Sequence, residues 1–143
     1  MDKRTLSRIS AFAQAQVLSS LAEKAAGGRK LLFLKKPEKT MVLVPVREPV
    51  KQSLFYLGEM LAAHCIVELA GVRGAAVVMG DDLSKAEATA VLDAAHSGAF
   101  KEFELVEPEL LRLDEERRAA CARQAAAVRQ TQVRFQVLED RKE

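Results

Sequence analysis

The sequence has few of the side chains that carry out chemistry. It contains two cysteines (Cys65 and Cys121), two histidines (His64 and His96), one tyrosine and no tryptophan. Two cysteines are too few for a disulfide framework, and without a Cys-x-x-Cys pair or a histidine cluster no zinc site is indicated. Aromatic residues make up only 5% of the chain, so a stacking platform for single-stranded nucleic acid is poorly supplied. The scarcity of these side chains predicts a protein with few residues able to act in catalysis.

Long apolar runs are also missing. No stretch approaches the roughly 18 apolar residues expected of a membrane-spanning helix. The first four residues, Met-Asp-Lys-Arg, precede an amphipathic stretch that is not typical of a signal peptide. The 143 residues are nonetheless 49% hydrophobic, which is enough to form a core. We therefore expect one cytoplasmic domain over residues 1–143, with no membrane association.

Charge is divided unevenly along the chain. Residues 1–51 carry 11 Lys and Arg against 4 Asp and Glu, whereas residues 52–143 carry 11 against 16. A basic first half, with its lysine-rich stretch over residues 29–51, is compatible with an anionic partner, with nucleic acid or with a merely solvated surface. No Gly-Lys-Ser/Thr sequence follows a strand, so a nucleotide-binding P-loop is not indicated.

Apolar spacing predicts helices at both ends of the chain. Leu6, Ile9, Ala13, Val17 and Leu21 recur at steps of three and four residues, which predicts one helix over residues 2–26. A second helix is expected to begin at a cap near residues 82–84 and to stop near residue 98. A third, of roughly 30 residues, is expected from residue 108, because proline is favoured at a first helical position.

Strand patterns occupy the middle of the sequence. Residues 31–34 and 41–46 predict two short strands, and Pro45 places the second at a sheet edge or makes it irregular. Alternation through residues 61–69, a turn at Ala70-Gly71 and a second apolar run over residues 72–79 predict a β-hairpin. Gly74 within that run suggests a bulge or a close approach of other backbone. Residues 100–106 read as a short strand or extended linker. The expected class is α+β, with a small antiparallel sheet and a central hairpin packed against helices.

The predicted last helix is too long for this chain to bury. At 1.5 Å per residue it spans about 45 Å, and its apolar stripe includes Cys121, which we expect in the core. Polar members of the same stripe favour either an apposed partner or a solvated helix end. The stripe consists of Leu110, Leu113, Cys121, Val128, Phe135 and Leu138, with Arg117, Gln124 and Thr131 between them.

No local arrangement of residues predicts an active site. His64 and Cys65 are neighbours in a strand and so point to opposite faces, which prevents a nucleophile–base pair. His96 falls at a helix C-terminus, where a cation is stabilised. Asp82, beside Asp81, is better explained as a helix cap than as a metal ligand. We expect no catalytic, cofactor-binding or metal-binding residue.

Several short motifs together resemble a known family. Leu57-Gly58-Glu59 opens the hairpin, Ala122-Arg123-Gln124-Ala125-Ala126 lies in the last helix, and Thr131, Val133 and Phe135 follow. Their order resembles the G subunit of the bacterial carbon–phosphorus lyase system, the PhnG family. The residues that we take as its structural motif are Gly58, Glu59, Gly71, Arg73, Gly74, Gly80 and Asp82.

The resemblance implies membership in a multisubunit transferase. In such a system the G, H and I subunits, helped by an L subunit, join a phosphonate to ribose C1 of ATP and release adenine. The J subunit then cleaves the carbon–phosphorus bond with an iron–sulfur cluster and S-adenosylmethionine. The G, H, I and J subunits form the core complex, and the resemblance supplies no catalytic residue or cofactor for the G subunit. It implies an accessory subunit that is inactive alone.

The last helix is the predicted contact with the I subunit. Interface hot spots favour buried aromatic and arginine side chains. The predicted interface residues are Arg123, Gln124, Val128, Thr131, Phe135 and Leu138. A basic nucleic-acid-binding module, or another protein-interaction module, remains the alternative function.

Overall fold

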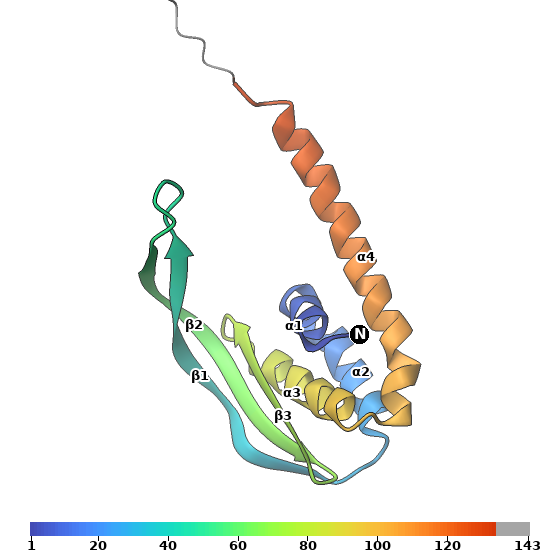
Figure 1. Cartoon of the computed structure of the whole chain (residues 1–143). Helices are drawn as coiled ribbons and strands as arrows, with labels where there is room; N and C mark the ends of the chain where they lie inside the picture. Colours follow the sequence, from blue (N-terminus) through green and yellow to red (C-terminus); the bar gives the residue numbers. More distant parts are fainter. Residues whose placement is uncertain (134–143) are drawn as a thin grey trace, which may run out of the picture.

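The computed structural model describes residues 1–133, in which helices pack on one face of an antiparallel sheet (Figure 1). α3 lies against β2 and β3, and α2 packs on α3. This confirms the α+β class, the small antiparallel sheet and the long C-terminal helix. The elements are α1 (Lys3–Phe12), α2 (Ala15–Ala26), β1 (Leu31–Arg47), β2 (Leu54–Leu69), β3 (Val72–Met79), α3 (Leu83–Ser97) and α4 (Lys101–Arg129).

The predicted single N-terminal helix is wrong, because the helix breaks into α1 and α2. Ala13 and Gln14 are extended, with ψ angles of 154° and 142°. The break turns the chain so that apolar side chains on both helices reach the core. Ile9 is 2% exposed and Leu18 is fully buried. The core therefore favours two shorter helices over one continuous periodic stretch.

β1 is one long strand, so the prediction of two short strands is also wrong. It pairs with β2 from Leu31 to Arg47, with register shifts near Phe33, Lys35 and Val44. Because β1 is an edge strand, its prolines need not donate to a second neighbour. Both predictions for Pro45 are confirmed, since β1 lies at the sheet edge and its register shifts between Val44 and Pro45.

The predicted hairpin is confirmed in β2 and β3. Ala70 and Gly71 form the turn with φ angles of 49° and 84°, a region that suits tight hairpin turns. Gly74 proves to be a close approach to α3. A Cβ built on Gly74 would lie 2.2 Å from the carbonyl oxygen of Ala90 and 2.7 Å from the Cβ of Ala94. Only a residue without a side chain allows α3 to pack this closely on β3.

α3 begins at the predicted cap. The Asp82 carboxylate accepts a hydrogen bond from the Lys85 backbone N–H at 3.0 Å, so Asp82 rather than Ser84 is the N-cap. Glu87 therefore does not occupy the third helical position of a capping box. The helix ends at Ser97 with Gly98 as its C-cap. Most of its alanines are buried between the sheet and α2.

α4 begins at Lys101, so the strand predicted over residues 100–106 is wrong and Pro108 lies inside the helix. The apparent alternation of Phe103 and Leu105 misled the prediction. Phe103, Val106 and Leu110 are buried at helical spacing, whereas Leu105 is 79% exposed. The segment forms a helix because helical spacing, and not strand alternation, brings its buried side chains to the core. Among the described residues, no helix combines the length and hydropathy needed to cross a bilayer.

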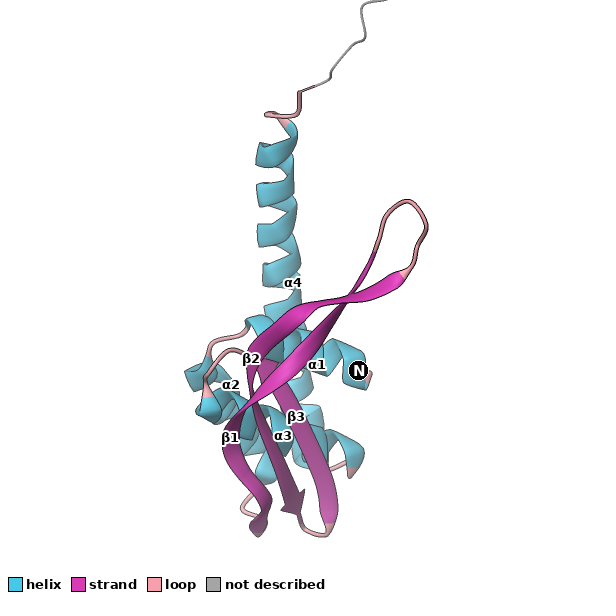
Figure 2. Cartoon of the chain, turned by 90° about the vertical axis from the view of Figure 1, so that its left-hand side faces the viewer, coloured by secondary structure: helices cyan, strands magenta, loops and turns pink. Residues whose placement is uncertain are grey.

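The second face of the sheet is uncovered. Figure 2 views the sheet from this side, with the helices behind it. Val77 is 63% exposed on this face and Met79 is 47% exposed. His64 also lies here, and its Nε2 is 3.2 Å from the Glu38 carboxylate. The described part of the chain thus leaves one apolar sheet surface facing outward.

Candidate functional site

The molecule divides into a packed body and two projections. The body comprises residues 1–40 and 62–117. One projection, the strand arm, consists of residues 41–61, and the other, the α4 extension, consists of residues 118–133. Both leave the same end of the body in two views at right angles (Figures 1 and 2).

The strand arm exists because β2 is twice as long as β3. β3 pairs with β2 only from Leu69 to Ala62, and the Gly80 N–H donates to the Leu61 carbonyl oxygen at 2.9 Å. Beyond this point β2 pairs with β1 alone among the described residues. A two-stranded ribbon has no second layer to bury its side chains.

Large apolar side chains therefore stay exposed along the strand arm. Leu57 is 69% exposed and Tyr56 is 63% exposed. A concentration of exposed large apolar side chains of this kind is typical of an interaction site. Its large exposed apolar residues are Met41, Leu43, Val50, Leu54, Phe55, Tyr56, Leu57, Met60 and Leu61. The sequence analysis missed this surface because it began the first hairpin strand at residue 61. The apolar run over residues 54–57 was a signal for it.

The α4 extension carries the predicted interface residues. Every described residue from 118 to 133 is exposed, including Arg123, Gln124 and Val128. The Thr131 hydroxyl donates to the Val128 carbonyl oxygen at 2.8 Å just beyond the helix. The predicted residues Phe135 and Leu138 lie outside the described residues. Helical spacing brings Gln124 and Val128 to one side of an unburied helix.

Cys121 also lies in the α4 extension, which corrects its predicted place in the core. The helix leaves the body after Arg117, so an apolar stripe that is buried at Leu110 is open to solvent at Cys121. Periodicity along a helix identifies a face. It does not show how far a neighbouring element continues to cover that face.

The family-motif residues do not converge on one site. Gly58 and Glu59 pair with β1 in the strand arm. Gly71 and Arg73 lie at the opposite end of the hairpin, where the Arg73 guanidinium is 3.8 Å from the Glu68 carboxylate. Gly74 packs on α3, and Gly80 and Asp82 connect β3 to α3. The contacts of these motif residues hold the strands and α3 in place relative to one another.

Cys65 and His64 lie on opposite faces of β2, as predicted from strand geometry. Cys65 is fully buried, and its thiol donates weakly to the Lys35 carbonyl oxygen at 3.5 Å. Burial, with a smaller contribution from Glu87, raises the pKa of the Cys65 thiol to about 11. A thiol held neutral in this way is a poor nucleophile.

His96 occupies the last turn of α3. Its Nε2 lies 2.7 Å from the Met1 carbonyl oxygen, and its ring meets Phe103 edge-on with centroids 5.1 Å apart. These contacts join the N-terminus, α3 and α4. His96 is therefore a packing residue in addition to its predicted place at the helix end.

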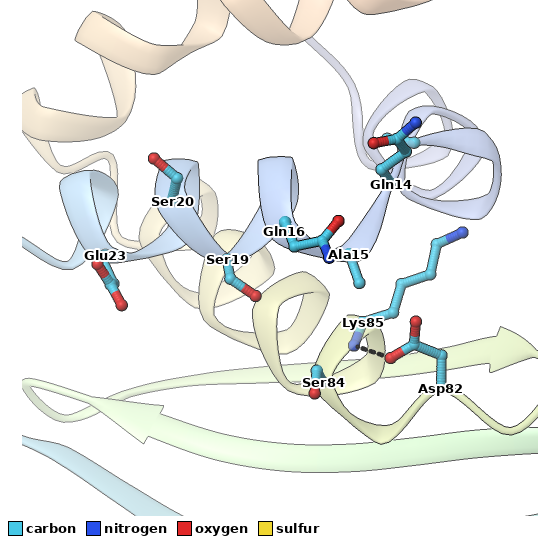
Figure 3. Close-up of a pocket in the computed structure, with 10 residues that line it drawn as sticks. Gln14, Ala15, Gln16, Ser19, Ser20, Glu23, Asp82, Ser84 and Lys85 are labelled. Atoms are coloured by element: carbon cyan, nitrogen blue, oxygen red, sulfur yellow. Dashed lines mark hydrogen bonds between the residues drawn. The ribbon is translucent and has the colours of Figure 1, made fainter.

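A polar depression separates the start of α2 from the start of α3 (Figure 3). Its volume is about 790 Å³. Lys85 is the cation among its lining residues, and its ammonium group donates to the Ala11 carbonyl oxygen at 2.8 Å. Asp82 caps α3 and turns its carboxylate to the Lys85 backbone. Across residues 1–133, no three His, Cys, Asp or Glu side chains are grouped to hold a metal ion.

A charged cluster lies where α4 leaves the body. Asp114 is 4% exposed and accepts hydrogen bonds from Arg8 of α1 and Arg117 of α4. Arg118 lies 2.7 Å from the same carboxylate. Hydrogen bonding from Arg8, followed by that from Arg117, holds the pKa of the Asp114 carboxyl below its ordinary value. The Arg117 guanidinium also stacks over Phe12, 5.2 Å from the ring centroid.

Comparison with known proteins places these features in a family. No curated protein sequence matches the chain. The model of the family described as phosphonate metabolism protein PhnG matches residues 2–139, which includes the body and both projections. The chain therefore belongs to the PhnG family and takes part in phosphonate metabolism.

Proposed function

We propose that this chain is a non-catalytic subunit of the carbon–phosphorus lyase core complex, assembled with the H, I and J subunits and working with the L subunit. In this role it supports the transfer of a phosphonate onto ribose C1 of ATP with release of adenine. The observation that carries the proposal is the pair of exposed projections on one end of a packed body.

The projections are suited to a protein partner. The strand arm exposes large apolar side chains, and hydrophobic surface of this kind is stabilised by burial at an interface. The α4 extension adds exposed arginine and valine side chains, with Val128 at 62% exposure. Arginine is enriched at interfaces because its guanidinium combines apolar faces with several hydrogen-bond donors.

The contacts of the titratable groups also support an accessory role. Cys65 is buried with a raised pKa, His64 is beside Glu38, and His96 contacts Met1 and Phe103. Each of these groups has a packing or pairing partner within the chain. We propose that ATP is bound elsewhere in the complex for the transfer step, and that the iron–sulfur cluster and S-adenosylmethionine belong to the J subunit.

We propose that the I subunit covers the α4 extension. The contact would include Arg123, Gln124, Val128 and Thr131, with Phe135 and Leu138 continuing the predicted stripe beyond the described residues. Because the described members have few intramolecular contacts, substitutions there are expected to alter assembly more than the stability of the body.

Co-expression with the H, I, J and L subunits tests the proposal. We expect the assembled proteins to release adenine from ATP and methylphosphonate, and the isolated chain to release none. Arg123→Glu combined with Phe135→Asp should abolish co-purification with the I subunit. Lys101→Glu, at the exposed start of the same helix, is the control and should leave it intact. Adenine release by the isolated chain would refute the accessory role, and unchanged co-purification of the double variant would refute the proposed contact.

A further inference from the structure

Three guanidinium groups surround one carboxylate at the junction of α1 and α4. Arg8 donates to Asp114 through Nε at 3.3 Å and Nη2 at 3.1 Å. Arg117 donates through Nε at 3.1 Å and Nη2 at 3.0 Å, and Arg118 Nε lies 2.7 Å from Oδ2. Among the described residues, Asp114 is the one carboxylate within ion-pair distance of these three guanidinium groups, so the ion pairs leave two positive charges unmatched. Asp2, which caps α1, is a more distant anion that interacts with Arg8.

Joining the two helices does not require all three arginines. Arg8 makes the ion pair to Asp114 that crosses from α1 to α4, and Arg117 reaches α1 by stacking over Phe12. Arg117 and Arg118 are on the same helix as Asp114, three and four residues further on. These two side chains add charge at the junction without adding a second cross-helix ion pair to Asp114. Like charges gathered in this way repel one another unless a further anion is present.

Unused donors remain on the two more exposed arginines. Arg8 Nη1 and both Nη atoms of Arg118 have no hydrogen-bond partner within residues 1–133. The Arg8 side chain is 38% exposed and that of Arg118 is 63% exposed. Both groups meet Asp114 at Oδ2. The shared carboxylate therefore holds the two guanidinium groups close together while both side chains remain partly exposed.

We propose that Arg8 and Arg118, positioned by Asp114, bind a phosphorus oxyanion: a phosphonate, inorganic phosphate or the phosphate group of a nucleotide. A dianion matches the two uncompensated charges, and its tetrahedral oxygens can accept from both guanidinium groups. A single partner carboxylate would leave one positive charge unmatched. The choice of a phosphorus oxyanion rests on the proposed function, whereas the excess charge and free donors do not.

Titration of the isolated full-length chain tests the site at fixed ionic strength. Methylphosphonate, inorganic phosphate and ATP are added separately, and binding is followed by calorimetry and by the ¹⁵N signals of the arginine Nε–H groups. We expect saturable binding of at least one of them, with the Nε–H signals of Arg8 and Arg118 shifting. The order of affinities identifies the source of the oxyanion. Arg118→Gln should weaken binding about tenfold or more, because a charged hydrogen-bonding group is lost.

Arg73→Gln is the matched control, since it removes the same charge from an exposed position at the opposite end of the hairpin. It should change the affinity less than twofold. Equal weakening by both substitutions, or no saturable binding of any of the three anions, would overturn the proposal. Loss of co-purification with the H, I and J subunits in Arg118→Gln, without anion binding by the unaltered chain, would instead assign the cluster to a partner carboxylate. The binding experiment uses the chain alone, so its failure is distinct from a failure to assemble.

Discussion

The body and the projections use similar amino acids to opposite effect. Leu92 in α3 is fully buried, whereas Leu57 in the strand arm is 69% exposed. Val91 is 5% exposed, and Val128 in the α4 extension is 62% exposed. Residue type alone does not separate core from surface. The difference arises because α3 is enclosed by β2, β3 and α2, while the projections extend past those neighbours.

This comparison teaches where stability and recognition reside. Apolar burial in the body stabilises the fold by about 25 cal/mol for each Å² removed from water. The same side chains on the projections contribute little to folding and remain available to a partner. Substitutions should therefore separate the two roles.

The largest contrast is expected between two leucine substitutions. Leu92→Ala should lower the free energy of unfolding by about 3 kcal/mol, because it removes contacts and leaves a cavity in the core. Leu57→Ala should change it by less than about 0.5 kcal/mol, as is usual for surface sites. Urea unfolding of each variant measures both values. A cost at Leu57 equal to that at Leu92 would show that the strand arm is an integral part of the core.

A smaller effect is expected where the body meets the α4 extension. Asp114→Asn should destabilise the chain near neutral pH, because the arginines lose their carboxylate partner. The pKa of Asp114 is lowered on folding from an ordinary value of 3.8. The contribution of Asp114 to the free energy of unfolding is therefore complete above the ordinary pKa. It is lost as the pH falls through the lower pKa of the folded state.

The stability difference between wild type and Asp114→Asn should accordingly shrink below about pH 3.8 in urea unfolding at several pH values. Asp81→Asn provides the control, since Asp81 is exposed and its oxygen lies 3.6 Å from the Lys39 ammonium. A difference for Asp114→Asn that is independent of pH would contradict an ionic role for the carboxylate.

The smallest structural disturbance comes from labelling the two cysteines. In the native chain a thiol reagent should modify exposed Cys121 quickly and buried Cys65 only after unfolding. Thiol titration with and without denaturant counts the reactive groups, and Cys121→Ser should remove the fast phase. Two fast thiols in the native chain would show that the sheet opens readily at Cys65.

Local sequence patterns predicted the elements in which the turn or cap residues and the neighbouring apolar residues indicated the same structure. The turn at Ala70-Gly71 lies between two apolar runs, and Asp82 precedes an alanine-rich stretch, so the hairpin and α3 were predictable. The predictions failed where the same residues fitted both the two-residue period of a strand and the period of a helix. Phe103 and Leu105 suggest a strand, but Phe103, Val106 and Leu110 share the buried side of α4.

The candidate sites were predictable only in part. The length of the last helix indicated an unburied end that carries Arg123 and Val128. The strand arm was missed because its apolar residues resemble those of a buried strand. The junction cluster was missed because Arg8 and Asp114 are 106 residues apart in the chain. An ion pair between residues so far apart produces no recognisable pattern in a single sequence.

The sequence by itself determined the α+β class, the central hairpin, the shortage of catalytic side chains and the resemblance to the PhnG family. These properties depend on composition, on short-range periodicity and on local motifs. The tertiary structure decided that α1 and α2 are separate, that β2 extends past β3, and that α4 leaves the body after Arg117. These three features depend on which helix or strand packs against each apolar face. That packing is fixed only when the whole chain is folded.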